Sequence, residues 1–211
     1  MKLSQRVQDI AESATLAVSA KAAKMKADGI DVISFGAGEP DFPTPPHIVE
    51  AAKRALDAGQ TKYPKPASGL PVLKEAIRTK LERENTLTYG TDQIVVTVGG
   101  KIGGNLVMQA ILDPGDEVII LAPYWVSYPE MVKLAGGVPV FVQGDEANGF
   151  CVTPEQIKAA ITDRTRALIL NSPSNPAGHL YTPARIRAIA AASPEERDFW
   201  RRCIELGVFT G

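Results

Sequence analysis

The sequence predicts an α/β fold in which helices cover both faces of a mostly parallel sheet. Short β-branched runs alternate with helix-like segments along the second half of the chain, and parallel strands need crossovers of this kind. The composition is 45% hydrophobic and 22% charged, which is typical of a globular protein rather than a disordered chain. A length of 211 residues suits one large domain or one and a half.

The first half of the chain is expected to hold mainly helices. Apolar residues at helical spacing between Val7 and Ala27 predict one or two helices that end at Asp28 and Gly29. Residues 36–43 are expected to form a loop, because their glycines and prolines disfavour regular structure. The other expected elements are, in chain order, a strand over 30–35, a helix over 47–58, a loop over 63–69, a helix over 70–84 and a strand over 94–98.

The second half alternates strands with helices, which predicts parallel βαβ units. Residues 113–116 (Asp-Pro-Gly-Asp) predict a turn. Thr153 is a good helix cap, and Pro154 and Glu155 favour the first helical turn, so a helix is expected to reach Ile161. The other expected elements are a helix over 106–112, a strand over 117–121, a helix over 128–135, a strand over 138–142 and a strand over 166–170.

Charge and composition exclude several classes of partner. The formal net charge of -1 argues against a basic surface for nucleic acid. No apolar run is long enough to cross a membrane, and the N-terminus lacks the continuous apolar segment of a signal peptide. Cys151 and Cys203 lie far apart in a chain with only 2 histidines, so neither a metal site nor a disulfide framework is expected. We therefore expect a cytoplasmic protein that binds neither nucleic acid nor membranes.

A ligand site is expected beyond the carboxyl ends of the strands, in the loops after Val98, Leu121 and Leu170. The first of these loops contains Gly99, Gly100 and Lys101. A strand, two glycines and a helix point backbone N–H groups at an anion, and the helix dipole and the lysine add positive charge. The same tripeptide is compatible with a plain strand-to-helix turn. No dinucleotide or nucleoside-triphosphate fingerprint is present.

The other two loops offer an aromatic surface and an amide. Tyr124, Trp125 and Tyr128 follow the second strand, where they form either a wall for a planar cofactor or a lid over the core. Asn175 precedes Pro176, which favours extended backbone. Its amide can donate to a phenolate or a carboxylate, although an Asn-Pro pair is also a common turn.

Together, the order and spacing of these motifs resemble the N-terminal half of class I aminotransferases, and in particular the aspartate/prephenate aminotransferase branch. Those fold-type I enzymes use pyridoxal 5′-phosphate (PLP) to transfer an amino group from an amino acid, such as aspartate, to a 2-oxo acid. The resemblance runs from about Leu3 to about Ala190. The motifs that carry it are residues 36–42, 61–63, 99–101, 113–118, 122–125 and 171–176.

The resemblance implies a role for each matching position. The implied cofactor-binding residues are Tyr63, Gly99, Gly100, Lys101, Trp125 and Asn175. Trp125 would stack on the pyridine ring, Asn175 would bond the 3′-oxygen, and the glycines and lysine would hold the phosphate. Tyr63 would reach the phosphate of the other subunit in a homodimer. Gly38 would present its backbone to the substrate carboxylate, with Trp125 and Asn175 also contacting substrate, whereas the histidines and cysteines match no functional position.

The resemblance also implies that the chemistry lies outside this sequence. The acidic partner of the pyridine nitrogen, the Schiff-base lysine and the substrate-binding arginine all lie beyond the last matching residue, so no catalytic residue is assigned. We expect a partial PLP-transferase fold, truncated before the C-terminal small domain, and no transaminase activity from these 211 residues alone. The alternatives are a non-catalytic relic, a module that pairs with a full-length relative, and an independent phosphate or nucleotide binder.

Three segments are expected. Residues 1–35 would form a helical arm and a first strand, residues 36–192 the N-terminal part of the large PLP-binding domain, and residues 193–211 a divergent tail. That tail is compatible with a capped helix followed by a strand, and equally with out-of-frame sequence. A further departure from the family pattern is the pair Gly103–Gly104, since each glycine inside a helix costs about 1 kcal/mol relative to alanine. This pair is expected to weaken the phosphate-binding helix.

Overall fold

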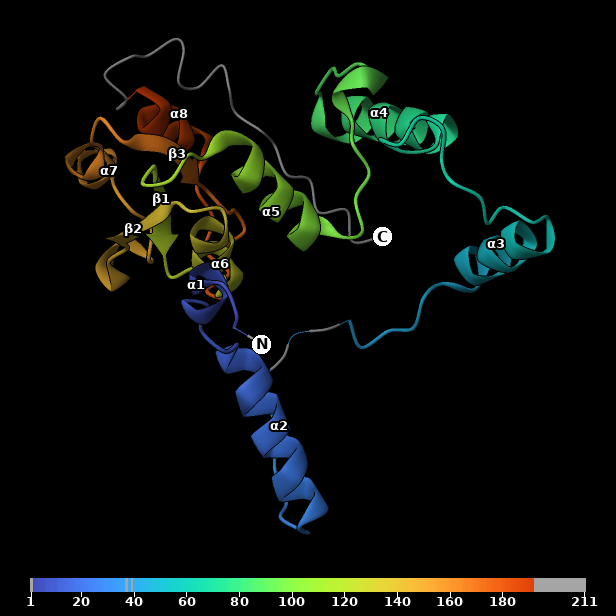
Figure 1. Cartoon of the computed structure of the whole chain (residues 1–211), viewed down its shortest axis with the longest axis horizontal. Coiled ribbons are helices and arrows are strands. Elements are labelled where there is room, and N and C mark those ends of the chain that lie inside the picture. The colour runs from blue at the N-terminus through green and yellow to red at the C-terminus, as the bar shows by residue number, and fades with distance from the viewer. Residues whose placement is uncertain (1, 37, 39, 192–211) are drawn as a thin grey trace. The chain divides into compact units, whose positions relative to one another are not determined.

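The structure is a computed structural model that describes residues 2–36, 38 and 40–191 (Figure 1). The described residues form two compact units. The first, called the sheet unit, comes from the segments Met1–Ser34 and Gly100–Gly211, and the second, called the helical unit, from Phe35–Gly99. The tail expected over 193–211 lies outside the described residues, and the three-segment division stays a prediction.

A three-stranded parallel sheet forms the centre of the sheet unit. Its strands are β1 (Glu117–Ala122), β2 (Val138–Gln143) and β3 (Thr165–Ile169), in the order β2-β1-β3. Glu117 pairs with Val138 of β2 and with Thr165 of β3, and the β1–β3 register shifts between Glu117 and Val118. Every residue of β1 is buried. The three strands expected in this part of the sequence and their parallel arrangement are confirmed.

Helices cover both faces of this sheet, as predicted (Figure 1). Successive side chains of a strand point to opposite faces, so β1 contributes to two apolar clusters. The helices that contribute to these clusters are α5 (Gly100–Ile111), α6 (Ser127–Leu134), α7 (Pro154–Ala160) and α8 (Pro183–Ala191). One cluster includes Ile119, Leu121, Val142, Cys151, Ile157 and Ile189. The other includes Met108, Leu112, Val118, Ile120, Met131 and Val132.

The predicted start of α7 is confirmed in detail. The Thr153 hydroxyl accepts a hydrogen bond from the backbone N–H of Gln156 at 3.3 Å, and the Gln156 side chain accepts one from the backbone N–H of Thr153 at 2.8 Å. This reciprocal pair satisfies two donors that a helix start leaves free. Ile157 is thereby fixed on the buried face of α7.

Two helices precede the sheet. They are α1 (Gln5–Gln8) and α2 (Ala14–Ala27), and the Ser13 hydroxyl caps α2 by accepting from the Leu16 backbone N–H. Gly29 then adopts a φ of +82°, which terminates the helix as expected. No residue of α2 is buried. No helix among the described residues is both long and apolar enough to cross a bilayer.

The helical unit contains α3 (Pro46–Asp57), α4 (Pro71–Asn85) and the short 3₁₀ helix η1 (Thr91–Gln93). Both longer helices were expected. Each has proline at its start, where the missing N–H costs nothing. Lys74 of α4 is 5% exposed, and its ammonium group donates to the Ser68 hydroxyl at 2.9 Å.

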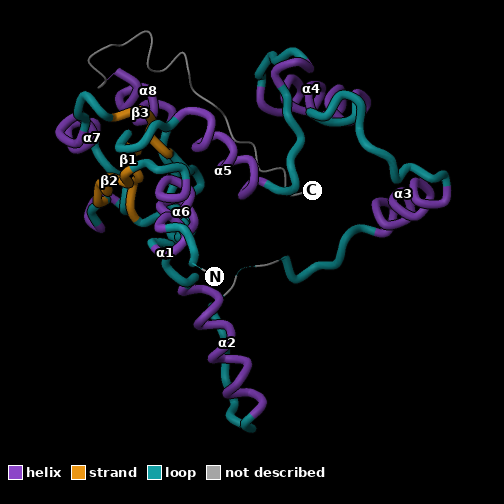
Figure 2. Tube along the Cα trace, viewed as in Figure 1, coloured by secondary structure: helices purple, strands orange, loops and turns teal. Residues whose placement is uncertain are grey.

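Two predicted strands are wrong. Residues 30–35 and 94–98 have irregular backbone, and Figure 2 draws the connection from α2 to α3 without a strand. A strand exists only within a hydrogen-bonded ladder, and the ladders of the sheet join only β1, β2 and β3 among the described residues. Accordingly Ile33 is 81% exposed and Val98 is 91% exposed.

Candidate functional site

The two loops that leave the carboxyl ends of β1 and β3 lie side by side. The hydroxyl of Ser174, in the loop after β3, donates to the carbonyl of Pro123, in the loop after β1, at 3.3 Å. This hydrogen bond joins segments that are 51 residues apart in sequence. The loops after β1 and β3, two of the three in which a ligand site is expected, therefore meet at one edge of the sheet. The third loop, after Val98, does not follow a strand.

Trp125 and Lys101 come together at this edge. The ammonium nitrogen of Lys101 lies 4.9 Å from the centroid of the Trp125 ring, a distance at which a cation is attracted to the face of an indole. Lys101 is exposed and occupies the first turn of α5. The N–H groups of such a turn lack partners within the helix, so a cation and free donors are present at the same place.

The aromatic residues of the loop after β1 pack against the core, which is one of the two interpretations given above, and the cofactor wall stays a prediction. Tyr124, Trp125 and Tyr128 are half-buried against the apolar cluster that includes Met108 and Val118. Trp125 meets Tyr128 edge-on at 5.4 Å and 89°. Burial raises the pKa of the Tyr128 phenol. The three side chains thus cover the core, while the Lys101 ammonium lies over the ring of Trp125.

Gly99 directly precedes α5 in the chain and is the last residue of the helical unit. Its φ of +87° lies in the left-handed region that favours glycine. Its carbonyl accepts from the Thr97 hydroxyl at 2.9 Å. The helix runs without interruption through Gly103 and Gly104, and both glycines are buried. The expected weakening of this helix by the two glycines stays a prediction.

Asn175 sits at the tip of a loop that is closed by its own hydrogen bonds. Its backbone N–H donates to Asn171 Oδ1 at 2.9 Å, and Ser174 N–H donates to the His179 carbonyl at 2.9 Å. Asn175 is exposed, and within the described part of the chain its side-chain amide has no hydrogen-bond partner. The amide is therefore free to bind a ligand.

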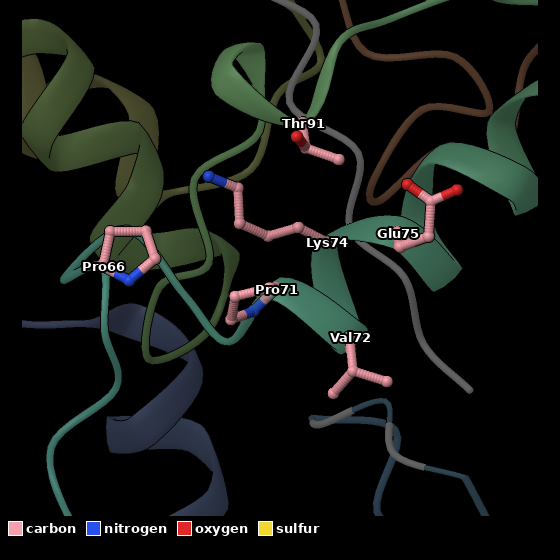
Figure 3. A pocket seen from close by; sticks show the side chains of 6 residues that line it. All are labelled: Pro66, Pro71, Val72, Lys74, Glu75 and Thr91. Carbon is pink, nitrogen blue, oxygen red and sulfur yellow. The ribbon is translucent and has the colours of Figure 1, made fainter.

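Gly38 and Tyr63 belong to the helical unit, where both are exposed, Tyr63 to 95%. Their assigned roles stay predictions. A pocket in the same unit lies beside the start of α4 (Figure 3). It is lined by Pro66, Pro71, Val72, Lys74, Glu75 and Thr91. None of the residues assigned to the site from the sequence lines this pocket, and no sequence motif predicts it.

Cys151 and His179, which have no assigned role, lie in the sheet unit. Cys151 is buried and its thiol lies 3.6 Å from the Leu180 carbonyl oxygen. His179 meets Tyr181 with ring centroids 5.4 Å apart. Its Nδ1 is buried and has no partner among the described residues, and burial lowers its pKa. No group of three metal-ligating side chains gathers anywhere in the described ranges.

Sequence reasoning missed Ser174. It is 8% exposed although Pro173, Asn175 and Pro176 around it are exposed. A single serine between two prolines carries no signal of its own, since its partner Pro123 belongs to another loop. Only the structure shows that this hydroxyl connects the two candidate ligand loops.

The arrangement suits a planar ligand that carries an anionic group. Lys101 and the start of α5 supply positive charge, Trp125 supplies an aromatic face, and Asn175 supplies a free amide. The residues present therefore fit PLP, whose parts are a ring, a phosphate and a ring oxygen. They include no lysine placed to bond the ring covalently, because the ammonium of Lys101 is already at the start of α5.

Comparisons with known proteins agree with this chemistry. The model of the family described as aminotransferase class I and II matches residues 30–199. The chain is 56% identical over 189 residues to an aspartate aminotransferase of Geobacillus stearothermophilus, covering 90% of this chain and 48% of that protein. It is 52% identical over 198 residues to the aspartate/prephenate aminotransferase of Thermus thermophilus, covering 94% of this chain and 51% of that protein.

Solved structures give the same result. Aspartate aminotransferase from Thermus thermophilus with maleate superposes with a TM-score of 0.88 at 51% identity, covering 93% of this chain and 51% of that one. Aspartate aminotransferase from Rhizobium meliloti superposes with a TM-score of 0.87 at 47% identity, covering 91% and 48%. The chain spans about half the length of the curated relatives it matches.

Proposed function

The chain belongs to the aminotransferase class I and II family, and from that premise we propose that its residues form the N-terminal part of the PLP site of an aminotransferase. The observation that carries the proposal is the placement of Lys101 over Trp125 at the first turn of α5. A cation, helix N–H groups and an aromatic face within one small region match a phosphorylated aromatic cofactor.

The three proposed site residues of the sheet unit, Lys101, Trp125 and Asn175, each have a separate role in binding the cofactor. Lys101 and the first turn of α5 bind the phosphate through charge and N–H donors. Trp125 stacks on the pyridine ring of PLP and so fixes the plane of that ring. The ammonium of Lys101 has to leave the indole face before the pyridine ring can stack there. Asn175 donates its amide to the 3′-oxygen and so helps to keep negative charge there. When bound, PLP itself supplies an electron-withdrawing ring that stabilises charge at the reacting carbon.

The substrates proposed are an amino acid, such as aspartate, and a 2-oxo acid. Support comes from relatives named aspartate or aspartate/prephenate aminotransferase that are 52–56% identical. Gly38 is proposed to present its backbone to the substrate carboxylate. Tyr63 is proposed to reach the phosphate in a second subunit, and its 95% exposure is consistent with a side chain that meets a partner.

The 211-residue chain is proposed to lack transaminase activity by itself. The covalent bond to PLP and the proton transfer at the substrate carbon both need a basic amine near the ring. Lys101 is assigned to the phosphate end and cannot serve both ends of the ring. A second candidate function therefore follows, in which the chain is a non-catalytic module that pairs with a full-length relative through the exposed region around Tyr63.

The binding proposal is tested with pyridoxamine 5′-phosphate, whose amine cannot condense with surface lysines. The chain has 2 tryptophans, so a Trp200→Phe variant makes Trp125 the reporter. Saturable quenching of Trp125 emission is expected, with much weaker quenching by pyridoxamine, which lacks the phosphate. Absence of saturable quenching would contradict the proposal, and displacement by ATP as effectively as by the cofactor would favour a general phosphate binder.

The activity proposal has its own test. The purified chain is incubated with PLP, aspartate and 2-oxoglutarate, and oxaloacetate is measured with a coupled assay. No turnover above the protein-free reaction is expected, and sustained turnover would overturn the proposal. Copurification with a full-length aminotransferase, lost on Tyr63→Ala, would support the pairing module, whereas a monomeric chain in its presence would argue against it.

A further inference from the structure

Ser174 is a buried polar residue inside an otherwise exposed turn. It is 8% exposed, whereas the residues on both sides of it are exposed. A hydroxyl is buried at a cost unless it is hydrogen-bonded. The Ser174 hydroxyl donates to the carbonyl oxygen of Pro123 at 3.3 Å, so its burial coincides with a contact to the neighbouring loop.

All the polar groups of Ser174 are engaged. Its N–H donates to the His179 carbonyl at 2.9 Å, and its carbonyl accepts from the Gly178 N–H at 2.8 Å. These two bonds close the loop after β3, here called the Asn175 loop, on itself. The loop after β1, which contains Pro123 and Trp125, is called the Trp125 loop. The third bond, from the side chain, is the one that leaves the loop. The side chain of Ser174 therefore links the loop after β3 to the loop after β1.

Pro123 provides the acceptor of this hydrogen bond. The parallel ladder of β1 ends at Ala122, whose carbonyl accepts from Gly144 N–H at 2.9 Å. As a proline, Pro123 has no N–H, so its carbonyl is its only backbone polar group. Along the chain, Trp125 lies two residues after Pro123, and Asn175 lies one residue after Ser174. The hydrogen bond thus joins the two loops within two residues of Trp125 and next to Asn175, the two residues assigned to the candidate ligand.

We infer that Ser174 is a positioning residue that locks the Asn175 loop to the Trp125 loop through the Pro123 carbonyl. It sets the separation of the amide and the indole without touching the ligand. The consequence for PLP rests on the proposed function, whereas the coupling of the loops stands on the geometry alone. Losing the hydroxyl frees both loops, which lowers the population of the arrangement that can bind a ligand.

The test compares two serines of the same loop in the Trp200→Phe background. Ser174→Ala removes the bond between loops. Ser172→Ala is the matched control, because the Ser172 hydroxyl accepts from Tyr181 N–H at 3.0 Å and has no hydrogen bond to the Trp125 loop among the described residues. Acrylamide quenching of Trp125 emission reports the freedom of that loop without any ligand. Ser174→Ala is expected to raise the quenching constant by about twofold, and Ser172→Ala is expected to leave it unchanged.

Rescue separates positioning from a general loss of structure. Ser174→Thr keeps the hydroxyl and is expected to restore the quenching constant to the parent value. Ser174→Cys is a close isostere with a weak donor and is expected to behave like Ser174→Ala. It replaces the alanine variant if that variant does not fold. Equal quenching in Ser174→Ala and the parent, an equal rise in Ser172→Ala, or failure of rescue by threonine would overturn the inference.

A ligand titration completes the design. Ser174→Ala is expected to weaken binding of pyridoxamine 5′-phosphate about tenfold, with Ser172→Ala close to the parent. If the parent shows no binding, the proposed function fails, and the acrylamide measurement still decides whether Ser174 couples the loops. If both variants bind like the parent, the positioning role is contradicted while the proposed function stands.

Discussion

Arg164 donates from Nε and from a terminal nitrogen to one carboxylate oxygen of Glu117, at 3.0 and 2.5 Å. The other oxygen accepts from the Thr162 hydroxyl at 2.6 Å. Glu117 is the first residue of β1 and is 4% exposed. This cluster lies at the amino end of the strand, whereas the Trp125 loop leaves its carboxyl end. Stability and ligand binding can therefore be altered separately along one strand.

The Glu117 cluster predicts an acid-sensitive fold. The hydrogen bond from Thr162, followed by the one from Arg164, lowers the pKa of the Glu117 carboxyl. The folded state therefore holds fewer protons than the unfolded state, and its stabilisation is present above the unfolded pKa of about 4.3. It is lost as pH falls through the folded pKa. Thermal unfolding between pH 7 and pH 3 measures this.

Glu117→Gln is the variant for that measurement. It is expected to lower the unfolding midpoint at pH 7 and to flatten the acid limb, because glutamine does not titrate. Glu155→Gln is a useful comparison, since its carboxyl is exposed at the start of α7 and its pKa is lowered by its own backbone and by Thr153. An acid limb that is equally steep in Glu117→Gln and the parent would contradict the assignment.

His179 predicts a second, milder dependence at higher pH. Burial lowers the pKa of its imidazole, and its Nδ1 has no partner among the described residues. Protonation is therefore easier in the unfolded state, and stability is expected to fall as pH drops below about 6.5. His179→Gln should remove this slope between pH 7 and pH 5. His47→Gln, on an exposed position of α3, should leave it intact, and equal slopes in both variants would refute the role of His179.

The sequence patterns predicted the sheet unit well because its elements are locally encoded. β-branched runs between turn residues mark β1, β2 and β3, and Thr153 with Pro154 marks the start of α7. Residues 30–35 and 94–98 have the same local pattern and form no strand. Their composition is compatible with a strand, but a strand also needs a neighbour, and that requirement depends on segments far away in the sequence.

Sequence motifs also predict some features of the candidate site and not others. Lys101, Trp125 and Asn175 follow from motifs, because a glycine pair before a helix and an Asn-Pro pair each constrain the local backbone. Two findings do not follow from motifs. The contact of the Lys101 ammonium with the Trp125 face and the bond from Ser174 to Pro123 join residues of different loops. Such contacts are set by packing around β1.

Gly144 gives a prediction about the turn after β2. An added Cβ would overlap the Phe150 carbonyl oxygen and lie 2.9 Å from the Ala122 carbonyl oxygen. Both are backbone atoms that cannot rotate away, so Gly144→Ala is expected to cost about 1–3 kcal/mol of unfolding free energy. Gly149→Ala meets no atom within 4 Å and is opposed by a φ of +62° alone, so about 1 kcal/mol is expected. Chemical denaturation compares the two, and a smaller loss at Gly144 would contradict the geometry.

Lys101 and Trp125 offer a measurement of the ligand-free site. The ammonium lies 4.9 Å from the ring centroid and is exposed, so the pair is expected to contribute about 0.5–1 kcal/mol. A double-mutant cycle with Lys101→Met and Trp125→Leu isolates this coupling from the separate effects of each substitution. Lys158→Met, at an exposed position of α7, is the matched control and should show no coupling to Trp125. Coupling close to zero for Lys101 would contradict a stabilising contact between its ammonium and the Trp125 ring in the ligand-free chain.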